Sequence, residues 1–294
     1  MAGAGQVDDV VRGPTGRTVG FLARGPEDGK AVVHLHGAPG SRREQHLVFP
    51  DDVLARFGIR AVTVDRPGYG NTDPLPGGRP ERAQDVLAVA DALGLDRFAL
   101  VGVSSGGTNA LTLAAVAPGR VDRVVLLAAQ MPYDDDEAIT ALQPGQAMGL
   151  PYLRGGRSEL IEQYCLDFRD ATLADPIGGF EEPTRTLSRR EQTWYSQAWV
   201  RDAFVADMQE AFRVGAEGYI DDALTSVRPF EVDVSAVRCP VRAVHGMSDD
   251  WEPLANLRRF LTQLLDAQLF LLDGMNHFGG IMYPDLTATL CLGA

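Results

Sequence analysis

Apolar residues follow two different patterns along this chain, short continuous runs and longer stretches with helical spacing. Residues 59–64 and 98–103 are almost entirely apolar, whereas residues 79–93 repeat apolar positions at helical intervals and end before Gly94. Strands without regular polar positions have no face for water, so they need cover on both sides. The alternation of such strands with helices predicts an α/β fold with a mostly parallel, doubly covered sheet.

The full pattern divides the chain into a core and an insertion. Expected strands are residues 18–23, 31–36, 59–64, 98–103, 124–128, 241–246 and 268–272, and expected helices are 42–57, 79–93, 108–117 and 254–265. Residues 131–230 contain no clear β-type run and hold helix-like, acidic and aromatic stretches. We therefore expect a core made of residues 1–130 and 231–294, with a helical segment of residues 131–230 inserted after the sixth strand.

Composition narrows the class of partner. The 294 residues carry a net charge of −13, which argues against nucleic acid or an anionic membrane as partner. The N-terminus has neither a basic start nor an apolar stretch, so no signal peptide is expected. Three cysteines, Cys165, Cys239 and Cys291, are far apart and suit a reducing compartment. We expect a cytoplasmic monomer or homodimer that acts on a small molecule.

A serine between two glycines follows the apolar run at 98–103. The sequence Gly102-Val103-Ser104-Ser105-Gly106 precedes an Ala/Leu-rich segment that ends before Pro118-Gly119. Gly-x-Ser-x-Gly between a strand and a helix is typical of a nucleophile elbow, a strained turn that exposes the serine hydroxyl. Ser104 is therefore the expected nucleophile; Ser105 has Val103 rather than glycine two positions before it.

A nucleophilic serine requires a general base and an acid that orients it. His277 follows the last expected strand in a loop, where its side chain can reach the carboxyl edge of the sheet. The acid is expected from the turn after the preceding strand, where Asp249 is the first choice and Asp250 the alternative. The order Ser104, Asp249, His277 is the serine–acid–histidine order of one particular fold.

The loop at residues 36–40 supplies the remaining part of such a site. His36-Gly37-Ala38-Pro39-Gly40 follows an early strand, and the amide of Ala38 is the natural hydrogen-bond donor because Pro39 has none. The second donor is expected to be the amide of Ser105, at the start of the helix after the elbow.

These motifs together resemble the α/β-hydrolase fold family, including its esterase and proline iminopeptidase-like branch. The motifs are the 36–40 loop, residues 65–70, the Ser104 elbow, the 246–253 turn and the His277 loop. The resemblance implies that residues 131–230 form a cap, or lid, over the active site. Twelve of the 22 aromatic residues fall in that segment, among them Tyr133, Tyr152, Trp194, Tyr195 and Trp199.

Several activities are compatible with these motifs. The first expectation is a serine esterase or lactonase, without cofactor or metal, for a small to medium apolar or aromatic substrate; its expected pocket residues are His36, Gly37, Tyr133, Trp194 and Trp199. An aminopeptidase of the proline iminopeptidase type would need cap carboxylates for the substrate amine, for which Glu181 and Glu182 are candidates. Hydrolysis of a carbon–carbon bond and non-catalytic binding of a small molecule also stay open.

Overall fold

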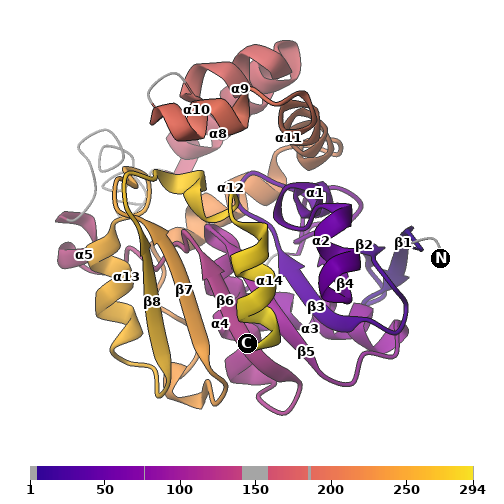
Figure 1. The fold of residues 1–294 in the computed structure, drawn as a ribbon. Helices are drawn as coiled ribbons and strands as arrows, with labels where there is room; N and C mark the ends of the chain where they lie inside the picture. Colours follow the sequence, from indigo (N-terminus) through magenta and orange to yellow (C-terminus); the bar gives the residue numbers. More distant parts are fainter. Residues whose placement is uncertain (1–4, 76, 141–157, 185–186, 294) are drawn as a thin grey trace.

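A computed structural model describes residues 5–75, 77–140, 158–184 and 187–293, which form a sheet of eight strands with helices on both faces (Figure 1). The spatial order of the strands is β1-β2-β4-β3-β5-β6-β7-β8. Their bounds are Val7–Arg12, Thr18–Arg24, Lys30–Leu35, Ile59–Val64, Phe98–Val103, Val121–Leu127, Val241–Gly246 and Ala267–Leu272 for β1 to β8. Strands β3 to β8 are parallel, and β2 pairs antiparallel with both β1 and β4. The expected mostly parallel, doubly covered sheet is confirmed.

Two apolar cores flank the sheet, one on each face. One core contains residues of α3 (Arg79–Ala92), α4 (Ser105–Val116) and α13 (Leu254–Leu261). The other contains residues of α1 (Gln45–Val48), α2 (Asp51–Phe57) and α14 (Pro284–Leu292). All six residues of β5 are buried because this strand lies in the middle of the sheet between the two cores. The central strands therefore form a rigid base for the loops that follow their carboxyl ends.

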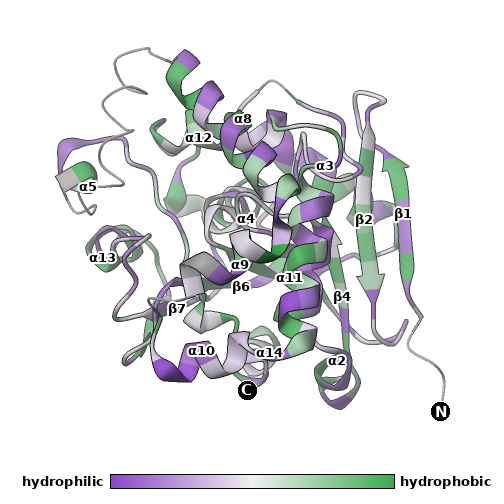
Figure 2. Ribbon diagram, turned by 90° about the horizontal axis from the view of Figure 1, so that it is seen from above, coloured by the Kyte–Doolittle hydropathy of each residue, from purple (hydrophilic) through white to green (hydrophobic). Residues whose placement is uncertain are grey.

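The helices between β6 and β7 lie over the carboxyl edge of the sheet. Those that the structure describes are α5 (Asp136–Thr140), α8 (Ser158–Ala174), α9 (Pro176–Thr184), α10 (Arg189–Tyr195), α11 (Ala198–Ala211) and α12 (Glu217–Ser226). Figure 1 shows α8 to α11 above the sheet, and the view from above in Figure 2 shows α9 and α11 across its middle. The expected helical insertion after the sixth strand is present. None of the described helices has the length and apolar character needed to cross a bilayer.

One strand was missed by the sequence analysis, and one expected helix was wrong. Strand β1 was not predicted, because five of its six residues are exposed and an edge strand of this kind lacks an apolar run. The single helix expected at 42–57 is instead a 3-10 turn at Arg42–Glu44 followed by α1 and α2. Pro50 separates the two helices, since it has no amide hydrogen to continue the first one and disfavours a helical conformation at Phe49.

Candidate active site

Ser104 lies at the turn between β5 and α4, in a backbone conformation that side chains rarely adopt. Its φ is 49° and its ψ is −121°, and its backbone is held by hydrogen bonds that include Ser104 N–H to the Leu127 carbonyl at 2.9 Å. A Cβ atom at Gly106 would lie 2.1 Å from the Leu35 carbonyl oxygen, and one at Gly102 would lie 2.6 Å from the Gly106 carbonyl oxygen. The glycines thus permit the close contact of strand and helix that this turn requires.

His277 and Asp249 meet at the carboxyl ends of β7 and β8. His277 Nδ1 is 3.0 Å from Asp249 Oδ2, and the other carboxylate oxygen accepts the backbone N–H groups of Trp251 at 2.9 Å and Glu252 at 3.0 Å. The Asp249 side chain has no solvent exposure, whereas Asp250 is exposed and only its backbone N–H contacts the His277 loop, at Asn276. Of the two candidate acids, the structure brings Asp249 to the histidine.

Asp249 and His277 each stabilise the charged form of the other. Burial acts to raise the pKa of Asp249, but the charge and hydrogen bond of His277 outweigh it and the pKa falls below its usual value. Burial acts to lower the pKa of His277, yet the carboxylate of Asp249 holds that pKa above its usual value. The Trp251 ring packs against the imidazole, with centroids 5.0 Å apart. The arrangement favours a histidine that accepts a proton and stays oriented afterwards.

Residues 36–40, named here the oxyanion loop after the role that the sequence predicts for them, lie against the elbow. The backbone N–H of Arg66 donates to His36 Nε2 at 3.0 Å, so the ring proton is on Nδ1, which donates to the Gly37 carbonyl at 2.8 Å. The Gly37 N–H donates to the Glu44 carboxylate at 3.2 Å. Within the described residues, the amides of Ala38 and Ser105 donate to no other residue. Two backbone donors therefore flank Ser104 at the same cavity.

A cavity of about 490 Å³ contains Ser104, His277, Ala38 and Ser105 in its wall. Gly37, Tyr133 and Trp194, three of the residues expected at a substrate pocket, also line it. Aromatic side chains from the core and from the helices above form much of the wall: Tyr133, Tyr164, Phe168, Trp194, Tyr195, Phe204, Tyr219, Trp251 and Phe278. Such a cavity has the size and character of a small-molecule site.

Two expected pocket residues lie elsewhere. His36 is fully buried behind the oxyanion loop. Both of its ring nitrogens take part in hydrogen bonds that hold that loop. Trp199 is 43% exposed on α11, where it meets Trp194 edge-on and donates to the Gln197 side chain. Neither residue lines this cavity. Tyr152 lies outside the described residues.

Carboxyl groups of the cavity wall were missed by the sequence analysis. Glu44, Asp207 and Glu252 all line the cavity. Asp207 accepts from the backbone N–H and hydroxyl of Ser41 at 2.9 and 2.6 Å, and Glu252 accepts from Tyr133 and from the Gln130 side chain. Burial raises the pKa of Glu252 to about 7. Glu252 could have been found from the sequence, because it lies in the same turn as Asp249. Glu44 and Asp207 come from distant segments and gave no such signal.

Comparison with known proteins gives the same fold. A hydrolase of Burkholderia vietnamiensis named for 2-hydroxy-6-oxononadienedioate and 2-hydroxy-6-oxononatrienedioate is 39% identical over 102 residues. That match covers 33% of this chain and 35% of the relative, so this chain spans about a third of its length. A non-heme chloroperoxidase of Streptomyces lividans is 28% identical over 290 residues, which are 93% of this chain and 96% of the relative.

Solved structures and a family model extend the similarity over the whole core. A thermophilic esterase from Thermogutta terrifontis superimposes with a TM-score of 0.66 at 19% identity, over 99% of this chain and 97% of that chain. At that identity the likeness shows the fold alone. A family model described as alpha/beta hydrolase fold matches residues 30–281. The chain therefore belongs to the alpha/beta hydrolase fold family.

Proposed function

We propose that the protein is a serine hydrolase that cleaves an ester or related acyl bond without a cofactor. Ser104 attacks the carbonyl carbon, and His277 takes its proton and returns it to the leaving group. Asp249 orients His277, and the amides of Ala38 and Ser105 stabilise the oxyanion. Water then releases the acyl group by the same steps. The observation that carries the proposal is the strained Ser104 turn sharing one cavity with the His277–Asp249 pair.

The cavity wall favours a neutral substrate with an apolar or aromatic body. Aromatic rings form much of the surface, and three carboxyl groups line it. Among the described lining residues there is no arginine or lysine to pair with a substrate carboxylate. A buried anion without such a partner is unfavourable. This composition argues against a dianionic substrate of the kind that the name of the Burkholderia relative states, and so favours ester over carbon–carbon cleavage.

A matched pair of esters tests this preference. Ethyl hexanoate and the monoethyl ester of adipic acid differ by a terminal methyl in place of a carboxylate. We expect kcat/KM for the neutral ester to be higher by about tenfold or more, because the anion enters without a cationic partner. Ethanol release measures both reactions, with Ser104→Ala as the blank. Equal or faster turnover of the anionic ester would overturn the assignment of substrate charge.

Peptidase activity and non-catalytic binding have less support. Glu181, a candidate for binding a peptide amine, is exposed and does not line the cavity, and the side chain of Glu182 lies outside the part of the chain that the structure describes. A binder without catalysis would not need a histidine held against a buried carboxylate. The paired His277 and Asp249 therefore favour turnover over binding alone.

The pH dependence of kcat/KM follows from the state of His277. Only the neutral imidazole accepts a proton, and Asp249 holds its pKa above 6.5. We expect kcat/KM to rise with pH through an apparent pKa above 6.5. The nearby charge of Glu252 also raises the pKa of His277, so Glu252→Gln should move this limb to lower pH. A pH–rate profile of the two proteins checks the shift; an unchanged limb, or one displaced to higher pH, contradicts the assignment.

A further inference from the structure

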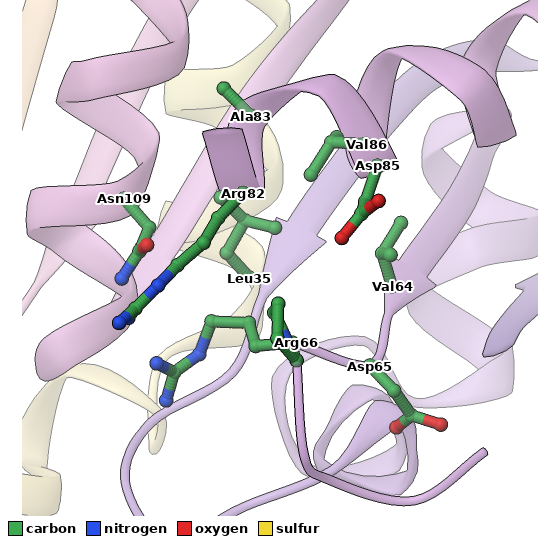
Figure 3. A pocket seen from close by; sticks show the side chains of 10 residues that line it. Leu35, Val64, Asp65, Arg66, Arg82, Ala83, Asp85, Val86 and Asn109 are labelled. Carbon is green, nitrogen blue, oxygen red and sulfur yellow. The ribbon is translucent and has the colours of Figure 1, made fainter. Parts of the chain in front are cut away.

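Arg66 is buried behind the oxyanion loop and does not line the catalytic cavity. It follows β4, is 4% exposed, and borders a void of about 10 Å³, which is too small for a substrate group (Figure 3). Arg82 of α3 is 5% exposed and borders the same void. Any effect of Arg66 on the reaction must therefore pass through the residues it contacts.

The Arg66 guanidinium bonds both segments that supply the oxyanion donors. Its Nε donates to the His36 carbonyl at 3.1 Å, and its Nη2 donates to the Gly37 carbonyl at 2.7 Å and to the Ser105 hydroxyl at 2.9 Å. The Gly37 carbonyl and the Ala38 N–H belong to one planar peptide unit. Fixing that carbonyl therefore fixes the direction in which the Ala38 N–H points.

The remaining nitrogen of the Arg66 guanidinium bonds a helix above the sheet. This nitrogen, Nη1, donates to Asp222 of α12 at 2.6 Å. Asp222 also accepts from the Tyr69 hydroxyl at 2.6 Å and from Arg82 at 3.2 Å. Burial acts to raise the pKa of Asp222, but the two guanidinium groups outweigh it and keep the carboxylate ionised. A continuous set of buried hydrogen bonds thus joins α12 to the two oxyanion donors.

We propose that Arg66 is a positioning residue for the oxyanion hole, holding the Ala38 and Ser105 amides in register, with Asp222 as its anchor in α12. The inference rests on the proposed function. Arg66 acts on the transition state rather than on substrate binding, since it is absent from the cavity wall but orients groups that bond the developing oxyanion. Its planar fork suits this task, because one rigid group spans four acceptors; a lysine ammonium cannot do so.

Arg66→Lys and Arg82→Lys form a matched pair that tests this role. Both keep the charge beside Asp222, but only the first loses the fork that holds the oxyanion loop. For a neutral ester we expect Arg66→Lys to lower kcat about 10- to 100-fold with KM changed less than about threefold. Arg82→Lys should lower the melting temperature by about as much as Arg66→Lys does, while its kcat changes less than about threefold. Equal kcat losses in the two variants, or a raised KM with kcat intact, would overturn the inference.

A second variant and a second readout keep the test decisive. Asp222→Asn removes the charge that anchors Arg66, and it replaces Arg66→Lys if that protein does not fold. We expect a kcat loss of about three- to tenfold, again with KM little changed. The rate of labelling by a fluorophosphonate, which also forms an oxyanion, should fall in parallel; a wild-type labelling rate in both variants would overturn the inference. Wild type that is neither labelled nor active would instead reject the proposed function itself.

Discussion

Ser104→Ala is expected to lower kcat for ester hydrolysis about 10⁴- to 10⁶-fold, because it removes the hydroxyl that is proposed to form the acyl-enzyme. Folding should be unaffected. The bonds that hold residue 104 are backbone bonds, from its N–H to Leu127 and from the amides of Gly107 and Gln130 to its carbonyl, and alanine keeps them all. Alanine also has the same Cβ as serine, so the strain at φ 49° is the same in both proteins. Steady-state kinetics and a thermal melt of the purified variant check both expectations.

The neighbouring serine provides the control for this experiment. Ser105→Ala keeps the backbone N–H that is proposed to bind the oxyanion and removes only a hydroxyl that accepts from Arg66. Ser105→Ala should therefore lower kcat by much less than Ser104→Ala, by less than about tenfold. A Ser104→Ala protein with near-wild-type activity, or a larger loss in Ser105→Ala, would contradict the assignment of the nucleophile.

Asp249→Asn is expected to lower kcat about 10³- to 10⁴-fold through the wrong tautomer of His277. The backbone N–H groups of Trp251 and Glu252 both donate to one oxygen of Asp249, and the amide oxygen of asparagine would take that place. Its NH₂ group would then face His277 Nδ1, so the ring proton moves to Nε2. A ring protonated at Nε2 cannot accept the proton of Ser104.

Asp250→Asn is the matched control, because it makes the same chemical change one residue away. The Asp250 side chain is exposed, and its contact with the His277 loop is made by the backbone N–H. We expect kcat within about threefold of wild type, as for most surface substitutions. The kcat values of the two asparagine variants are compared under identical conditions. A larger loss in Asp250→Asn than in Asp249→Asn would assign the acid to Asp250 instead.

Local sequence was sufficient to predict the parts of the fold and of the candidate site that depend on neighbouring residues. The apolar run of β5 and the glycines around Ser104 are contiguous in sequence. The glycines are needed because the backbone segments at this one turn are in close contact. The exposed strand β1 gave no such signal. The division expected at residues 130 and 231 also stays a proposal, since secondary structure alone does not define a domain.

Contacts between distant segments set the limit of what could be predicted. Asp207 of α11 bonds Ser41, and Asp222 of α12 bonds Arg66, across sequence separations of 166 and 156 residues. Nothing in the spacing of these residues relates one partner to the other, because helix packing over the sheet decides which side chains meet. His36, whose motif suggested a pocket residue, uses both ring nitrogens in hydrogen bonds to Gly37 and Arg66, which the motif alone does not reveal.

The central claim is that Ser104 is an activated nucleophile, and covalent labelling tests it most directly. The wild type and Ser104→Ala are incubated with a fluorophosphonate probe and analysed by intact mass, then by peptide mapping. We predict one adduct on the wild type, mapped to Ser104, and none on the variant. A folded wild type that stays unlabelled, or an adduct that persists in Ser104→Ala, would contradict the claim.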